Sequence, residues 1–187
     1  DITSVVVIKD GKLILEEYFN GSNRNSLHDT RSVGKSFAST LTGFAIRDGY
    51  LQNENQKLGT FYPLKTFSDY STQKENISIK DLLTMSSSFD GSDRNDQSPG
   101  NEENMYPTAN WVTFTLNLPT DSLKQNGQQW DYFTAGVILI GDILHKSIPE
   151  GLQKYAERTL FNPMEIANYE WQYTPQNVAN TAGSLQL

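Results

Sequence analysis

Residues 32–45 read Ser-Val-Gly-Lys-Ser-Phe-Ala-Ser-Thr-Leu-Thr-Gly-Phe-Ala. Apolar side chains recur in this stretch at i, i+4, i+7 and i+8, which predicts a helix with one buried face. They are Phe37, Leu41, Phe44 and Ala45. Ser32 and Lys35 stand three residues apart at the start of the helix, so their side chains are neighbours within hydrogen-bond reach. A desolvated lysine can act as a base and activate a serine without histidine.

The Ser-x-x-Lys spacing alone is weakly specific, and the chain contains it twice. The second copy, Ser71-Thr72-Gln73-Lys74, lies in a polar stretch without an apolar period and is interpreted as a coincidence. The copy at Ser32 opens a helix, whose N-terminus has positive potential and free N–H groups. The backbone N–H of Ser32 is therefore a candidate for half of an oxyanion hole. The alternative is that Ser32 caps the helix and Lys35 is solvated.

Tyr132 supports the catalytic interpretation. It lies in the stretch 129–134, Gln-Trp-Asp-Tyr-Phe-Thr, directly before a strongly apolar run at 134–146 that predicts a buried helix. A phenol placed near Lys35 would pass a proton to and from Ser32. The alternative is an ordinary half-buried aromatic residue. Together, Ser32, Lys35 and Tyr132 predict a serine hydrolase that works through an acyl-enzyme.

The remaining pattern predicts a hairpin followed mainly by helices. Residues 4–8 and 13–19 are strand-like and are joined across Asp10-Gly11, a typical hairpin turn. The continuous apolar run at 5–8 predicts a strand buried on both faces. A helix is predicted from the capping-box pattern at 78–81, and others at 111–118 and 152–160. The stretch 89–107 is predicted to be a long loop, and long loops in compact domains are often functional.

At these residues the chain resembles the serine β-lactamases of class C type, with the related penicillin-binding proteins and family VIII esterases. The resemblance covers nearly the whole chain and rests on an ordered set of motifs, each of them soft by itself. After the hairpin, the set comprises Ser32-Val33-Gly34-Lys35 with its helix through Asp48-Gly49-Tyr50, the stretch 79–86, Tyr132-Phe133-Thr134, Leu139-Ile140-Gly141 and the stretch 160–164.

The resemblance implies a role for each of these side chains. Ser32 would attack the carbonyl carbon of the substrate, and Lys35 and Tyr132 would share the acid and base work. Thr134 stands where the family's Tyr-x-Asn motif carries asparagine; its shorter hydroxyl can still hydrogen-bond a substrate carbonyl. We therefore expect ester hydrolysis more than β-lactam turnover. Trp130 is close enough to Tyr132 to line the substrate pocket, although core or rim packing is the commoner role of tryptophan.

The resemblance also implies a β-lactamase/transpeptidase-like α/β (α+β) fold, with an antiparallel sheet flanked by helices and a helical region. Residues 1–187 are expected to form one domain of this kind, with the N-terminal hairpin of the sheet and most of the helical region. The family's third motif, Lys-Thr-Gly or His-x-Gly, does not follow Tyr132. We therefore expect the C-terminal strands and helix of the domain to be missing from this chain.

The expected function is hydrolysis of an ester or amide, such as a β-lactam, a D-amino-acid peptide or a small ester, through an acyl-serine intermediate. Two alternatives stay open: a penicillin-binding sensor that acylates without turnover, and a catalytically inactive relative. Neither metal nor cofactor is expected, and His28 and His145 do not form a ligand set. A small-molecule ester, amide or β-lactam is the expected partner.

Composition argues against several other classes of protein. The net charge of −7 and the pI of about 4.8 argue against nucleic acid as a partner. No apolar run in the sequence is long enough to span a bilayer. The chain has no cysteine, which excludes disulfides and thiolate metal sites. A periplasmic or secreted location is expected from the family resemblance alone, and the oligomeric state stays open.

Overall fold

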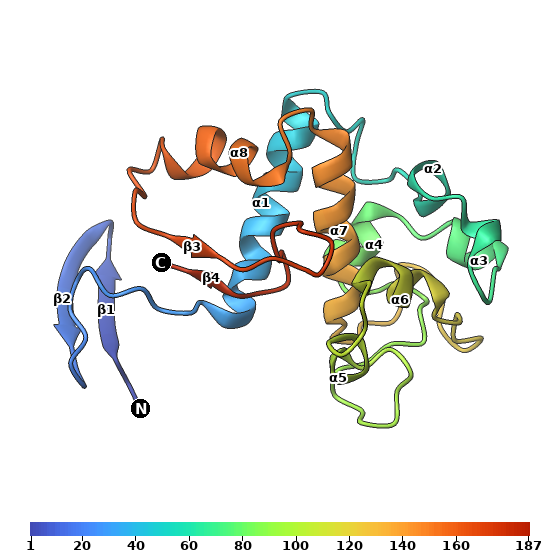
Figure 1. Ribbon diagram of the computed structural model, residues 1–187, viewed down its shortest axis with the longest axis horizontal. Coiled ribbons are helices and arrows are strands. Elements are labelled where there is room, and N and C mark those ends of the chain that lie inside the picture. Colours follow the sequence, from blue (N-terminus) through green and yellow to red (C-terminus); the bar gives the residue numbers. More distant parts are fainter.

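The computed structural model describes residues 1–187, which begin as a two-stranded hairpin and continue mainly as helices (Figure 1). In chain order the elements are β1 (Ser4–Lys9), β2 (Lys12–Tyr18), η1 (Arg31–Val33), α1 (Gly34–Arg47), α2 (Leu58–Phe61), η2 (Leu64–Thr66), α3 (Thr72–Glu75), α4 (Ile79–Leu83), α5 (Glu102–Met105), α6 (Trp111–Asn117), α7 (Thr134–Ser147), α8 (Leu152–Ala156), η3 (Glu157–Phe161), β3 (Glu170–Trp171) and β4 (Leu185–Gln186).

Helices α1 and α7 pack against each other at the centre of the molecule (Figure 1). The helix predicted at 134–146 is confirmed as α7, and every residue from 134 to 144 is buried because α4, α6 and α8 also contact it. A helix that is apolar on all sides belongs in a core. The amphipathic α1 buries Ala38, Leu41 and Ala45 in the same core.

The start of α4 and the end of α1 follow local signals in the sequence. Ser78 accepts a hydrogen bond from the Asp81 backbone N–H, and the Asp81 carboxylate accepts one from the Ser78 N–H, so the predicted capping box is confirmed. Gly49 has φ +81° just after α1, the left-handed conformation of a helix C-terminus. The helix predicted at 111–118 is confirmed as α6, and the one at 152–160 forms as α8 followed by a π-helical turn, η3.

Strands β1 and β2 form the predicted hairpin, with positive φ at both Asp10 and Gly11 in its two-residue turn. The prediction that residues 5–8 are buried on both faces is wrong for this chain. Val6 is 53% exposed and Ile8 is 67% exposed. The hairpin lies beside the helical region, and the two strands make their extensive contacts only with each other (Figure 1). Its apolar side chains are exposed because no other element of the 187 residues covers them.

A second small sheet brings the end of the chain to the start of α1. Strands β3 and β4 are antiparallel, and β4 continues the ladder onto residues 28–30. The Thr30 N–H donates to the Leu185 carbonyl at 2.9 Å, and the His28 N–H donates to the Leu187 carbonyl at 2.8 Å. Residues 182–184 therefore pass beside η1, the turn that carries Ser32.

Candidate active site

Ser32 lies in the 3₁₀ turn η1 and does not cap the following helix. The N-cap position of α1 is Val33, and no side chain makes the capping bond. The Lys35 Nζ donates to the Ser32 Oγ at 3.0 Å, and the Ser32 side chain is exposed. Arg31 has φ +50°, a conformation that costs energy in a non-glycine residue. The Asp29 carboxylate holds this turn, since its Oδ1 accepts from the Arg31 N–H at 2.8 Å.

The half-buried Lys35 has a second hydrogen-bond acceptor, the carbonyl oxygen of Ala182, at 2.6 Å from its Nζ. Two glycines allow this approach. A Cβ on Gly34 would lie 3.2 Å from the Gly183 Cα, and a Cβ on Gly183 would lie 3.2 Å from the Arg31 carbonyl oxygen. The ammonium is thus held between the Ser32 hydroxyl and a backbone carbonyl.

Helix α7 fixes the position of the Ala182 carbonyl. The Thr181 Oγ1 donates to the Val137 carbonyl at 2.8 Å. Thr181 packs so closely on Gly141 that a Cβ there would lie 2.5 Å from the threonine hydroxyl. Residues 181–183, just before β4, therefore pack against α7 on one side and against η1 on the other. Nothing in the sequence indicates that a carbonyl in residues 181–185 contacts Lys35.

Tyr132 lies beside Lys35, as the sequence predicts. The Lys35 Nζ is 5.1 Å from the centre of the Tyr132 ring, a cation–π distance. The phenol is half-buried and directly precedes the buried start of α7. Ser32, Lys35 and Tyr132 are thus brought together from η1, α1 and the segment before α7. Their catalytic roles stay predictions.

The two predicted substrate-binding residues lie on either side of Tyr132. Thr134 is 1% exposed, and its Oγ1 is buried without a hydrogen-bond partner. Trp130 is 57% exposed, and its ring centre lies 6.4 Å from that of Tyr132. The Trp130 side chain is therefore open to solvent, whereas the Thr134 hydroxyl is not on the surface of this chain. Their roles in substrate binding stay predictions as well.

Asp93 belongs to the site although no pattern in the sequence singles it out. Its carboxylate accepts a hydrogen bond from the Thr134 backbone N–H at 2.6 Å, and its own N–H donates to the Tyr132 carbonyl at 2.8 Å. Burial raises the pKa of the Asp93 carboxyl, and the hydrogen bond from the Thr134 backbone N–H opposes this effect. Asp93 belongs to the stretch 89–107, and the prediction that this whole stretch is a loop is wrong, because the short helix α5 (Glu102–Met105) lies within it. Composition cannot tell which polar residue of the stretch reaches the site.

Both side chains of the second Ser-x-x-Lys copy, Ser71 and Lys74, hydrogen-bond the backbone of the protein. Ser71 is the N-cap of α3 and accepts from the Lys74 backbone N–H at 3.0 Å. The Lys74 side chain is completely buried, and its Nζ donates at 3.0 Å to each of two carbonyl oxygens, those of Ser68 and Leu116. Its ammonium therefore contacts backbone carbonyls and not the Ser71 hydroxyl. This arrangement agrees with the interpretation of the copy as unrelated to catalysis.

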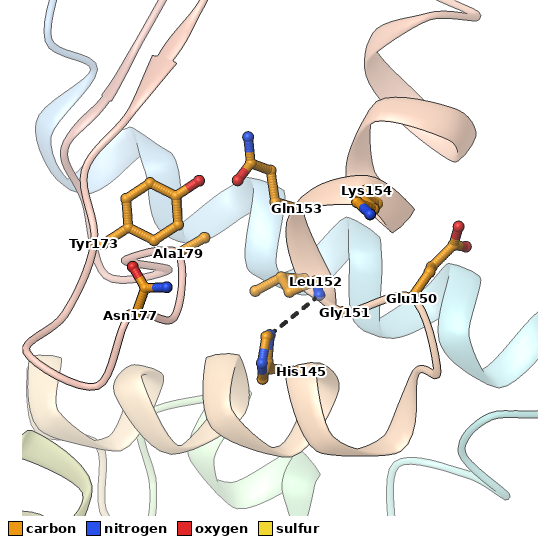
Figure 2. Close-up of a pocket in the computed structure, with 9 residues that line it drawn as sticks. All are labelled: His145, Glu150, Gly151, Leu152, Gln153, Lys154, Tyr173, Asn177 and Ala179. Carbon is orange, nitrogen blue, oxygen red and sulfur yellow. Dashed lines mark hydrogen bonds between the residues drawn. The ribbon is translucent and has the colours of Figure 1, made fainter.

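The pocket drawn in Figure 2 lies at the opposite end of α7 from Tyr132. It has a volume of about 270 Å³ and lies between His145, the start of α8 and the loop that carries Tyr173 and Asn177. His145 is 11 residues beyond Thr134, which corresponds to about 16 Å along a helix. None of the five pockets of this chain is lined by Ser32, Lys35 or Tyr132.

Neither of the two histidines belongs to a cluster of metal-binding side chains. His28 contacts the Thr3 hydroxyl through Nδ1 at 3.0 Å, and the His145 Nδ1 accepts from the Leu152 N–H at 3.4 Å (Figure 2). No three His, Cys, Asp or Glu side chains converge as the ligands of a metal ion do. No helix in the structure combines the length and the apolar character needed to cross a bilayer.

The chain matches a known protein family and has the fold of several solved structures. The family model described as Beta-lactamase matches residues 3–186, and no curated protein sequence matches the chain significantly. A protein described as a 6-aminohexanoate-dimer hydrolase from Bacillus anthracis has a similar fold, with a TM-score of 0.76 and 15% identity over 98% of this chain and 50% of that one.

Two further solved structures are similar at the same level. A D-stereospecific amidohydrolase from a Streptomyces species has a TM-score of 0.67 and 14% identity, covering 92% of this chain and 60% of that one. A class C beta-lactamase has a TM-score of 0.68 and 19% identity, covering 98% of this chain and 55% of that one. These identities establish a shared fold. The chain spans about half the length of the structures that it matches.

Proposed function

The chain belongs to the beta-lactamase family, and we propose that it acts as a serine hydrolase that cleaves an ester or amide through an acyl-Ser32 intermediate. The observation that carries this proposal is the 3.0 Å contact between the Lys35 Nζ and the exposed Ser32 Oγ, with the Tyr132 ring 5.1 Å from the same ammonium. A nucleophile in contact with a basic side chain, which a third group orients, is the arrangement that activates serine.

The proposed reaction runs in two steps. The Lys35–Tyr132 pair enters this step with one of its two groups deprotonated, either the Lys35 amine or the Tyr132 phenol, so that it can accept a proton. The Ser32 Oγ attacks the carbonyl carbon while its proton passes to this pair, and the resulting oxyanion collapses to an acyl-serine ester. The departing alcohol or amine takes up the proton. Water then attacks the ester, transfers a proton to the same pair and releases the acid with Ser32 regenerated. The backbone N–H of Ser32 is the proposed first donor to the oxyanion.

The proposed substrates are small esters or amides more than β-lactams. Thr134 occupies the position of the family's asparagine, and a hydroxyl offers one donor where the amide offers two. The buried Oγ1 of Thr134 also lacks a direct route to a substrate carbonyl in this chain. One of the similar structures is described as a 6-aminohexanoate-dimer hydrolase and another as a D-stereospecific amidohydrolase. An acylating sensor and an inactive relative are the competing functions.

Steady-state hydrolysis by the complete protein tests the proposal. Turnover of p-nitrophenyl butyrate, a D-amino-acid amide and nitrocefin would be compared between the wild type, S32A and S71A. We expect S32A to lower kcat/KM for the ester by at least about 10³-fold, whereas S71A leaves it within about twofold. A stoichiometric burst without turnover would indicate the sensor, and equal rates for the wild type and S32A would contradict the proposed function.

A further inference from the structure

Asp93 makes hydrogen bonds to the backbone of the segment that carries Tyr132. Its N–H donates to the Tyr132 carbonyl at 2.8 Å, and its Oδ2 accepts from the Thr134 N–H at 2.6 Å. Its second carboxylate oxygen accepts from the Glu102 N–H at 2.9 Å, at the start of α5. One residue of the stretch 89–107 therefore binds the backbone immediately before and after Phe133. Two bonds that span three consecutive residues fix both the position and the direction of the chain.

Helix α7 begins without a cap of its own. Its N-cap position is Phe133, which has φ −142° and ψ 92° and provides no side-chain acceptor. The Asp93 carboxylate takes over this role from 41 residues away in the sequence. A carboxylate at a helix N-terminus pairs with unsatisfied N–H groups and with the positive end of the helix dipole. The start of α7, and with it Tyr132, therefore depends on a residue from another loop.

Neighbouring contacts strengthen the same junction. The Ser92 Oγ donates to the Asp131 Oδ1 at 2.6 Å, and the Asp131 N–H donates to the Met85 carbonyl at 2.9 Å. Gly91 lies against the Phe133 ring so closely that a Cβ on Gly91 would be 2.2 Å from it. Residues 91–93 thus pack against 131–134 as a unit, and Asp93 is the member that contacts the residues on both sides of Phe133.

We propose that Asp93 is a positioning residue that holds Tyr132 beside Lys35 for proton transfer, an inference that rests on the proposed serine-hydrolase function. Asp93 does not touch the reacting atoms; it acts through the backbone of residues 132–134. An amide at this position presents one acceptor oxygen and turns its donor NH₂ toward a backbone N–H, so one of the two carboxylate bonds is lost. The freed backbone would let the Tyr132 ring move away from the Lys35 ammonium.

A double-mutant cycle between Asp93 and Tyr132, measured in the complete protein, separates positioning from general destabilisation. The variants are D93N, Y132F and D93N/Y132F, assayed for kcat and KM with p-nitrophenyl butyrate below the unfolding temperature of each. We expect D93N to lower kcat by about 10- to 100-fold with little change in KM. On the Y132F background the same change is expected to cost less than about twofold, because the residue through which Asp93 acts has already lost its hydroxyl.

Two controls complete the experiment. D96N changes an exposed carboxylate of the same loop and is expected to behave as wild type. If D93N does not fold, D93S keeps a neutral side-chain acceptor and replaces it in the cycle. An equal loss of kcat in both backgrounds would contradict positioning through Tyr132, and so would an unchanged kcat in D93N. Absence of Ser32-dependent turnover in the wild type would instead overturn the proposed function, and the role of Asp93 with it.

Discussion

Lys35 lies between two oxygen acceptors that come from opposite ends of the chain. The Ser32 Oγ, at 3.0 Å, is within reach because of the three-residue spacing on one turn. The Ala182 carbonyl, at 2.6 Å, is within reach only because β4 pairs with residues 28–30. The first contact is predictable from the sequence, and the second depends on tertiary structure. The same distinction explains why Asp93, whose partners lie 39 and 41 residues further on, was not found from the sequence.

K35M should abolish most of the activity while the protein stays folded. Methionine preserves the length of the side chain but cannot hydrogen-bond the Ser32 Oγ or exchange a proton with it. We expect kcat/KM for an activated ester to fall by about 10²- to 10⁴-fold. Steady-state assays check this, with K80M as the control because Lys80 is an exposed lysine on α4. An activity within threefold of the wild type would exclude Lys35 as the base.

K74A should have the opposite effect to K35M: it should lower stability and leave the activity of the folded protein unchanged. The alanine leaves the carbonyls of Ser68 and Leu116 without their donor and opens a cavity in place of a fully buried side chain. We expect the free energy of unfolding to fall by about 2–4 kcal/mol, with kcat/KM unchanged in the folded fraction. Urea unfolding and ester hydrolysis measure the two quantities. A specific loss of turnover without destabilisation would show that the second Ser-x-x-Lys copy has a catalytic role.

At the scale of elements, local signals decided some of the boundaries, although α1 and α7, the two long helices, begin without a side-chain cap of their own. The capping box at Ser78 and the Asp10-Gly11 turn are both found where the sequence predicts them. The pairing of distant elements was not predictable in this way. The packing of Thr181 on Gly141, which fixes the carbonyl behind Lys35, follows from the crossing of two segments 40 residues apart.

G141A should therefore disturb the site from inside α7. A Cβ would approach the Thr181 hydroxyl to 2.5 Å, inside contact distance. Overpacking of about 1–3 kcal/mol is expected to outweigh the gain of up to about 1 kcal/mol from alanine in a helix. We expect a lower urea midpoint and slower ester turnover. G43A is the matched control, because a Cβ on Gly43 in α1 meets nothing within 4 Å and should raise the midpoint. Destabilisation by both variants would contradict this explanation.

At the scale of the whole molecule, the helical core closes around α7 while the hairpin stays exposed (Figure 1). The run at 5–8 correctly predicted a strand, because β-branched residues favour extended backbone. It wrongly predicted burial in this chain, because burial depends on what packs on a strand and not on the strand itself. The similar structures are about twice as long as this chain, and a continuous apolar run carries no information about which element packs on the strand.

Lowering the pH should weaken the contact between Asp48, at the end of α1, and Tyr155 in α8. Hydrogen bonds from Arg47 and Tyr155 lower the pKa of Asp48 to about 2, from an ordinary value of 3.8. A carboxyl whose pKa is lower in the folded than in the unfolded protein stabilises the fold. The stabilisation is complete at pH values above the pKa of the unfolded state, and it is lost as the pH falls through the pKa of the folded state. We expect the difference in unfolding midpoint between the wild type and D48N to be constant above pH 5 and to vanish between pH 4 and pH 2.

Thermal unfolding of both proteins from pH 2 to pH 7 measures this difference. D96N serves as the control, because it removes an exposed carboxylate that makes no hydrogen bond within the chain. A difference between the wild type and D48N that persists unchanged at pH 2 would show that the ionised Asp48 is not what stabilises the junction.

The identity of the nucleophile is tested most directly by covalent labelling. The complete protein would be treated with a fluorophosphonate, weighed intact by mass spectrometry and mapped by peptide analysis, alongside S32A and S71A. The contact between the Lys35 Nζ and the Ser32 Oγ predicts one adduct per chain, on the peptide that contains Ser32. This adduct should be lost in S32A and kept in S71A. An adduct on another serine, or an unlabelled wild type, would contradict the assignment of Ser32 as the nucleophile.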